Sequence, residues 1–251
     1  MVDVPLILVS AVAVFAAALV QGVTGFGFVI VAAPVLTIYL EPTLVVPVML
    51  LQSVALNAAI LIGGYRRINL RRVWALVLAG AALTPVGAAL LIGLDGAIIR
   101  VVMGVVVGVT SVGMLLGIQR TASNERLASI PVGAASGLLG GATGLSGPPV
   151  VLFFANQGVD PKEFRANLVF YFQVLNLIAL PSFAIGGILT RDVLMLSLVL
   201  LPGALAGVGV GIWLAPRIAV ALFRRISLVV VLLAGVGAVV SGLIGYSAAR
   251  G

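Results

Sequence analysis

Long apolar segments alternate with short polar connections along the whole chain. Backbone groups inside a lipid bilayer must be hydrogen-bonded within the protein, so apolar segments of this length are expected to be helices that enter or cross a membrane. The ten predicted segments are residues 4–21, 28–40, 43–64, 73–94, 97–118, 128–140, 148–157, 164–188, 193–214 and 222–246. They predict an all-α polytopic membrane protein.

The ten segments fall into two similar groups of five. Several features recur at a separation of 119 residues: Thr24-Gly25 as Thr143-Gly144, Glu41-Pro42 as Asp160-Pro161, and Asn57 as Asn176. Acidic residues followed by proline are typical of helix starts, so Glu41 and Asp160 are predicted N-caps. The recurrence indicates an internal duplication.

The placement of basic residues favours inverted repeats. Cytoplasmic loops retain Lys and Arg. With the loop 65–72 in the cytoplasm, 11 of the 14 basic residues are cytoplasmic if each broken pair of segments returns to its starting side, and only 8 if each pair crosses once. We therefore expect two inverted repeats of five helical segments, each opening with a broken or re-entrant helix pair. Residues 1–118 form the first repeat, 119–127 a cytoplasmic linker and 128–251 the second repeat.

The breaks themselves are the predicted binding site. Non-helical backbone at membrane depth lines a cavity or is buried in protein, and each resuming helix directs unpaired N–H groups and the positive end of its dipole toward the break. Two such ends facing one space predict an anion site at the midplane. The candidate residues at the breaks are Thr24, Gly25, Gly27, Thr143, Gly144, Ser146 and Gly147. Ser146 is a predicted N-cap, with Pro148 and Pro149 in the first turn that follows.

Four polar residues inside apolar helices have two interpretations. Asn57, Asn176, Gln52 and Gln173 could complete the pocket or could hydrogen-bond between helices. They are kept as candidate substrate-binding residues, and the symmetric asparagine pair suits a twofold-related pocket. Most other helical glycines are expected to allow close helix packing, namely Gly80, Gly87, Gly104, Gly108, Gly207, Gly209 and Gly211.

Arg100 and Arg225 precede the last helix of each half. One interpretation makes them vestibule or gating residues that concentrate anions on opposite sides of the membrane. The other makes them lipid anchors whose side chains extend to the headgroups.

Several classes of function lack the residues they need. The chain has no His and no Cys, its seven carboxylates lie in loops or at helix ends, and no GxxxxGK[ST] motif is present. An enzyme active site within the membrane, a metal or other cofactor and an ATP-driven motor are therefore not expected. The net charge of +7 comes from residues placed between apolar segments, which leaves no basic face for nucleic acid. A secondary carrier, an anion channel and a non-catalytic membrane subunit remain open.

At QGVTGFGF (21–28) and GATGLSGPPVV (141–151) the chain resembles the sulfite exporter TauE/SafE family, also called the 4-toluene sulfonate uptake permease family. The duplication and the arginine before each last helix belong to the resemblance, which covers essentially the whole chain. It implies a multi-pass permease of the bacterial inner membrane for sulfite, sulfoacetate or another organosulfonate. The implied partners are a small anionic substrate and membrane lipid, and a homodimer is one assembly left open.

Overall fold

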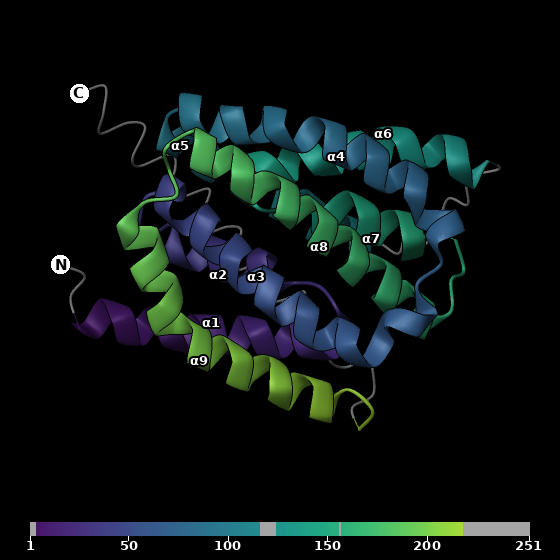
Figure 1. The fold of residues 1–251 in the computed structure, drawn as a ribbon, viewed down its shortest axis with the longest axis horizontal. Helices are drawn as coiled ribbons and strands as arrows, with labels where there is room; N and C mark the ends of the chain where they lie inside the picture. The colour runs from purple at the N-terminus through teal and green to yellow at the C-terminus, as the bar shows by residue number, and fades with distance from the viewer. Residues whose placement is uncertain (1–3, 116–123, 156, 218–251) are drawn as a thin grey trace.

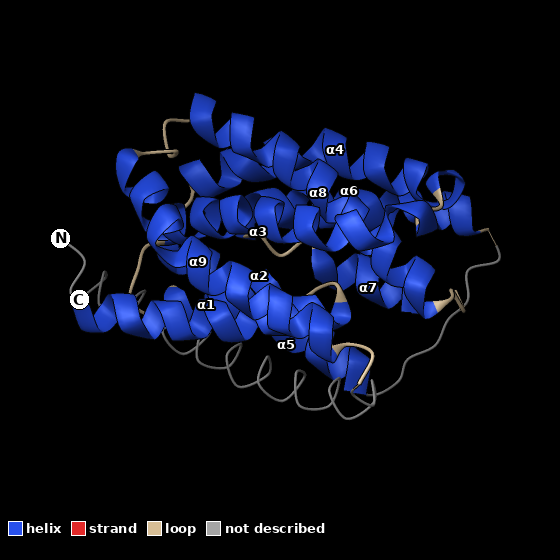
Figure 2. Cartoon of the chain, turned by 60° about the horizontal axis from the view of Figure 1, so that its bottom comes forward, coloured by secondary structure: helices blue, strands red, loops and turns tan. Residues whose placement is uncertain are grey.

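The computed structural model describes residues 4–115, 124–155 and 157–217, and all regular structure in these ranges is helical (Figure 2). The elements are α1 (Val4–Thr24), α2 (Phe28–Leu36), α3 (Pro42–Gly64), the 3₁₀ turn η1 (Tyr65–Arg67), α4 (Leu70–Gly93), α5 (Gly96–Leu115), α6 (Glu125–Thr143), α7 (Gly147–Ala155), α8 (Pro161–Ile185) and α9 (Arg191–Leu214). Nine of the ten predicted segments are confirmed, with ends that differ by a few residues. The tenth, 222–246, and Arg225 lie outside the described residues.

The distribution of side chains suits a lipid environment. The described residues contain five helices that are long and apolar enough to cross a membrane: Ile7–Thr24, Pro42–Arg67, Leu70–Gly93, Pro161–Ile185 and Arg191–Leu214. On the outer surface Val12 and Ile62 are 70% and 79% exposed, whereas the polar Gln21 and Asn57 are buried inside. Large apolar side chains on the outer surface, with polar side chains kept inside, are the arrangement expected of a membrane protein.

The helices form three layers (Figure 1). α4 and α6 lie along one side, α1 and α9 along the other, and α3 and α8 pack against each other between them. The short helices α2 and α7 follow directly on α1 and α6, and each also packs against the long helix that follows it. The middle of the molecule therefore contains the long helices α3 and α8, and each has the short helix of one broken pair packed against it.

Glycines let the outer pairs of helices approach closely. A Cβ atom added at Gly137 would lie 2.1 Å from the carbonyl oxygen of Gly80, and one added at Gly211 would lie 2.4 Å from that of Leu19. These contacts join α4 to α6 and α9 to α1, and they confirm the predicted packing role of Gly80, Gly87, Gly207 and Gly211. For Gly108 and Gly209 an added Cβ would meet no atom of the described residues within 4 Å, so their packing role stays a prediction.

Polar contacts bring three connections together at one end of the molecule. The backbone N–H of Asn69 donates to Asn167 Oδ1 over 2.8 Å. The guanidinium of Arg72 pairs with Glu125 at the start of α6 and with Glu163 at the start of α8. The end of α3 therefore lies beside the start of α8, and these two central helices run in opposite directions.

The two predicted N-caps differ. Asp160 accepts hydrogen bonds from the backbone N–H groups of Lys162 and Glu163, which confirms it as the cap of α8. Glu41 precedes α3, but its side chain caps nothing and instead pairs with Arg100 over 3.1 Å. A cation within reach gives the Glu41 carboxylate a charged partner in place of the backbone amides.

Candidate functional site

A small cavity lies where both broken helix pairs meet the central helices. Its described lining residues are Gln21, Gly27, Val29, Ile30, Ser53, Asn57, Gly144, Ser146, Gly147, Phe172 and Asn176. Its volume is about 30 Å³, which is enough for at least one water molecule. The lining comes from α1, α2, α3, α7, α8 and the two breaks, so both halves of the chain contribute.

Both breaks contain a Thr-Gly pair with similar hydrogen bonds. The hydroxyl of Thr24 donates to the carbonyl of Val20 over 2.9 Å and accepts from the N–H of Phe26. In the second half Thr143 Oγ1 donates to the carbonyl of Leu139 over 2.7 Å and accepts from the N–H of Leu145. Each threonine therefore links a carbonyl near the end of its helix to an N–H group just beyond that end, and neither is a lining residue of the cavity.

Glycine then turns the chain. Gly25 and Gly144 follow the two threonines with φ values of 83° and 74°, and Gly27 has a φ of 104°. A side chain is strained at such angles, so glycine ends α1 and α6 and lets α2 start in a new direction. In the second half Ser146 precedes α7, and Pro148 and Pro149 occupy its first turn as predicted.

A chain of hydrogen bonds fixes the orientation of two amide side chains in the cavity wall. The N–H of Phe28 donates to Gln21 Oε1 over 3.1 Å, so Gln21 must present its Nε2 on the other side. That group donates to Asn57 Oδ1 over 2.6 Å. Because Asn57 Oδ1 faces Gln21, its Nδ2 points away from Gln21. This Nδ2 is a buried donor with no partner among the described residues. Amide orientations are normally ambiguous, but here the backbone N–H decides both.

The remaining polar groups of the wall are uncharged. Ser53 and Asn176 also line the cavity, as do Val29 and Ile30 of the first turn of α2. The backbone amides of that turn have no acceptor within their own helix. Among the described lining residues none is ionisable. Because both α2 and α7 begin at the cavity, their positive dipole ends add to the field there. The site therefore offers hydrogen-bond donors and partial positive charge without a formal cation.

The predicted site residues divide into three groups. Gly27, Asn57, Gly144, Ser146, Gly147 and Asn176 are brought together around the cavity, while Thr24, Gly25 and Thr143 shape its two breaks from behind. Gln52 and Gln173 do not line it. Gln52 Nε2 donates to the carbonyl of Ser197 in α9 over 3.0 Å, and Gln173 Oε1 is buried without a partner among the described residues. The helix-linking interpretation therefore describes Gln52.

Arg100 makes contacts within the protein. Its side chain is 17% exposed and donates to the carbonyls of Thr37 and Leu40 while pairing with Glu41. It ties the start of α5 to the connection between α2 and α3, it does not line the cavity between the breaks, and its vestibule role stays a prediction. Arg225 lies outside the described residues.

Sequence reasoning missed Gln21, Ser53 and Phe172. A signal for the last two was present, because Ser53 precedes Asn57 by four residues and Phe172 precedes Asn176 by four, which places each pair on one helix face. Gln21 opens the motif QGVTGFGF but has no polar counterpart in the second half, where Gly140 stands at the same separation. Comparing the halves for shared polar residues therefore passed over it.

The comparisons with known proteins give one match. The family model described as sulfite exporter TauE/SafE matches residues 10–238, which includes both breaks and every described lining residue of the cavity. Comparison with curated proteins and with solved structures gives no match.

Proposed function

Because the chain belongs to the sulfite exporter TauE/SafE family, we propose that it is a secondary transporter that moves a small sulfur-containing anion across the bacterial inner membrane. In this proposal the anion is held at the midplane, in the cavity between α2, α3, α7 and α8. The broken helices supply amides and dipoles, and Asn57, Asn176, Ser53 and Ser146 supply side-chain donors.

The observation that carries the proposal is the free donor of Asn57. Asn57 is fully buried, its Nδ2 has no partner among the described residues, and the side chain lines the cavity. A buried donor without a partner costs about 1–3 kcal/mol, and a hydrogen bond from it to a charged group contributes about 1.5–3 kcal/mol. An oxyanion in the cavity would remove the penalty and gain the bond.

The size of the cavity bears on the substrate. A volume of about 30 Å³ suits a compact oxyanion such as sulfite better than an aromatic sulfonate. Sulfite presents three oxygen acceptors around one sulfur, which matches a wall made of donors on several sides. We therefore propose sulfite as the first substrate to test, with sulfoacetate and other aliphatic sulfonates after it.

We further propose that the halves are inverted repeats with the connection 65–72 in the cytoplasm. Support comes from the opposite directions of α3 and α8 and from the contacts of Arg72 with Glu125 and Glu163, which gather three connections at one end. The boundaries follow the duplication: residues 1–118, a linker at 119–127, and residues 128–251. Inverted repeats around a central site are suited to alternating access.

Reconstitution into liposomes tests the function. The parent protein should exchange labelled sulfite for internal sulfite, with saturation and acceleration by substrate on the far side, and sulfoacetate, taurine and sulfate should be compared as competitors. Asn57→Asp keeps the acceptor for Gln21 and replaces the donor by a carboxylate, so apparent affinity should fall about tenfold to hundredfold. Lowering the pH protonates that carboxyl. The apparent affinity of the variant should then move closer to the affinity of the parent measured at the same pH.

Ser197→Ala is the matched control. Ser197 is buried in α9, its hydroxyl has no partner in the part of the chain that the structure describes, and it does not line the cavity. The substitution should therefore leave the affinity unchanged. Large currents without saturation would identify a channel instead of a carrier. No flux of any of the four compounds through the purified protein would contradict the proposed function.

A further inference from the structure

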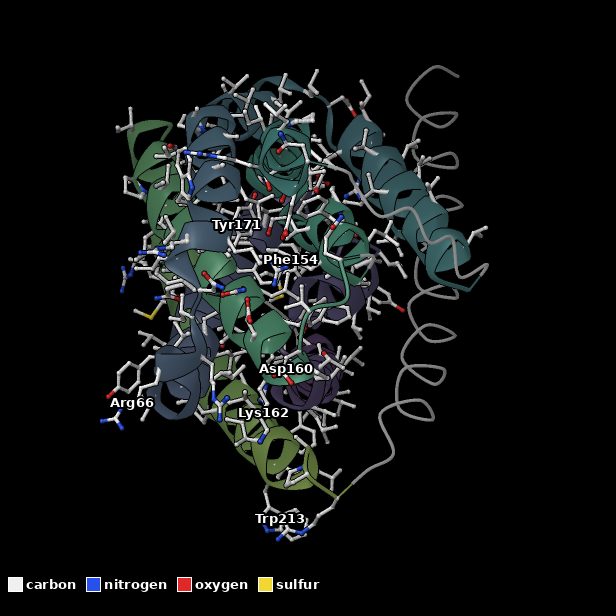
Figure 3. All side chains as sticks on the ribbon, turned by 90° about the vertical axis from the view of Figure 1, so that its right-hand side faces the viewer. Arg66, Phe154, Asp160, Lys162, Tyr171 and Trp213 are labelled. Carbon is white, nitrogen blue, oxygen red and sulfur yellow. The ribbon has the colours of Figure 1, made fainter. Side chains whose placement is uncertain are left out.

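A second, larger hollow lies at the end of the molecule where α3 ends and α8 begins. Its volume is about 440 Å³, and its described lining residues are Ala59, Ile60, Leu61, Gly63, Gly64, Arg67, Lys162, Arg165, Ala166 and Ile212. Three of them are basic and none is acidic. Figure 3 labels Lys162 beside Asp160 at the start of α8. We call this hollow the basic vestibule.

The three cations of the basic vestibule have no ion-pair partner among the described residues, in contrast to Arg72 and Arg100. The carboxylates nearest in sequence are already engaged. Asp160 caps α8 through backbone amides, and Glu163 pairs with Arg72. Positive charge that lines a hollow without neutralisation raises the local concentration of anions.

Arg165 connects the basic vestibule to the first break. A Cβ atom added at Gly25 would lie 2.4 Å from Arg165 Cγ, so the aliphatic part of this side chain lies directly on the break. Its Nη2 donates to the carbonyl of Gly22 in the last turn of α1, while its Nε is buried without a partner among the described residues. One side chain therefore lines the vestibule and covers the end of α1 behind the central cavity.

The second break is covered differently. The position 119 residues before Arg165 is Val46, and Val46 packs on Gly144 together with Leu50 and Val29. Corresponding positions thus cover corresponding breaks, but one cover is a cation beside a hollow and the other consists of aliphatic side chains. This difference gives the two ends of the transport path unequal chemistry.

We propose that the basic vestibule is the loading site for the transported oxyanion, and that Arg165 is its inner ligand. The inference rests on the proposed transport function. Arg67 and Lys162 attract the anion from the side of the connection 65–72, and Arg165 then exchanges the carbonyl of Gly22 for the anion. A hydrogen bond to an ionised acceptor is stronger than one to a neutral carbonyl, so the exchange is favourable and uncovers Gly25. The anion then passes to the donors of the central cavity.

Any oxyanion shares the chemistry that this site recognises, including the phosphate of a lipid headgroup. The hollow is lined by Leu61 and Gly63, the chain neighbours of the strongly exposed Ile62, so we consider both a dissolved anion and a headgroup as sources. We commit to the dissolved anion, and the experiments separate the two sources by changing lipid composition.

Lys162 gives a direct readout of occupancy, because it is the only lysine of the chain. Purified protein in a nonionic detergent is treated with an acetylating reagent at low ionic strength, with a lysine-containing peptide in the same tube as reference. Sulfate, which is inert toward the reagent, should slow acetylation of Lys162 relative to the peptide, whereas chloride at equal ionic strength should not. Arg67→Gln and Arg165→Gln should each weaken this protection. Equal rates with sulfate and chloride would overturn the proposal.

Transport supplies the second test. In oriented liposomes of phosphatidylcholine alone, Arg67→Gln and Lys162→Gln should each raise the apparent KM for sulfite about tenfold from the side of the connection 65–72, at the lower end of what charge steering contributes. The increase should fade at high salt, where screening acts over about 3 Å, and should be absent from the opposite side. Arg191→Gln, an exposed basic residue outside the vestibule, is the control and should match the parent.

The outcomes separate this inference from the transport function. A parent that transports sulfite together with vestibule variants that match it on both sides would overturn the loading site and leave the transport function standing. Variants that differ from the parent only when phosphatidylglycerol is present would assign the vestibule to lipid headgroups, which also overturns the proposal. A parent without flux contradicts the proposed function itself, and sulfate protection of Lys162 is then read independently.

Discussion

At the scale of single residues, the decisive feature is the direction in which a side-chain amide points. The N–H of Phe28 sets Gln21, and Gln21 sets Asn57, so a backbone group of α2 determines that the cavity receives a donor. A reversed Asn57 would present an acceptor and repel an anion. The proposed preference for anions thus depends on a hydrogen-bond chain that reaches outside the cavity.

Removing Gln21 should therefore affect both folding and binding. Gln21→Leu leaves the N–H of Phe28 without its acceptor and frees Asn57 to rotate, so the free energy of unfolding should fall by about 1–3 kcal/mol and sulfite affinity should drop. Gln173→Leu is the control, because Gln173 Oε1 is already buried without a partner among the described residues. It should leave both the Tm in detergent and the affinity near the parent's. Equal effects of the two substitutions would contradict the relay through Gln21.

The sequence predicted the breaks better than it predicted the roles of their residues. Thr24 and Thr143 were candidate ligands because they recur beside glycine, yet their hydroxyls bond within their own helix ends. A residue that recurs in both halves can serve either the fold or a ligand. A hydroxyl at a helix end forms the same kinds of hydrogen bond as one that binds a ligand, so recurrence alone does not separate the two roles. Gln21 was missed because its role depends on a contact with Asn57, 36 residues away.

At the scale of helices, close packing of the outer pairs holds the broken segments in place. α6 must lie against α4 for the break at Gly144 to reach the cavity, and this approach depends on glycine facing glycine. The hydrophobic pattern predicted the helices. It could not predict which helices pack against each other, because that depends on contacts between residues far apart in the sequence. Gly108 and Gly209 illustrate the limit, since they resemble packing glycines in sequence, but a Cβ added there would meet no described atom within 4 Å.

A Cβ at Gly137 would collide with the backbone of Gly80. Gly137→Ala should therefore push α4 and α6 apart and lower the free energy of unfolding by about 1–3 kcal/mol, as overpacking does elsewhere. Gly209→Ala makes the same chemical change in α9, where the added Cβ would meet no atom of the described residues within 4 Å, and should not lower the Tm. Comparing the two Tm values in one detergent checks the assignment, and a Gly137→Ala protein as stable as the parent would contradict it.

At the scale of the whole molecule, the two central helices α3 and α8 run in opposite directions and each contributes one asparagine to the same cavity. The proposed inverted-repeat topology requires the connection 65–72 and the start of α8 to face the same compartment. Because the chain has no cysteine, single introduced cysteines report their side without background.

Ile68→Cys and Lys162→Cys should react with a membrane-impermeant maleimide from the cytoplasmic side. Asp95→Cys, in the connection between α4 and α5, should react from the opposite side. The labelling is measured in intact cells and in inverted vesicles, with detergent-treated membranes as the total. Labelling of residues 68 and 162 from opposite sides would exclude the inverted arrangement.

The most direct test of the central claim is equilibrium binding of radiolabelled sulfite to the purified protein in detergent, compared between the parent and Asn57→Asp. If the anion binds at the donor of Asn57, the parent should bind sulfite saturably. Asn57→Asp should bind it with roughly tenfold to hundredfold weaker affinity, and Ser197→Ala with the affinity of the parent. Sulfite binding of equal strength in the parent and in a folded Asn57→Asp protein would show that the anion does not bind at the donor of Asn57. That result would contradict the proposed anion site.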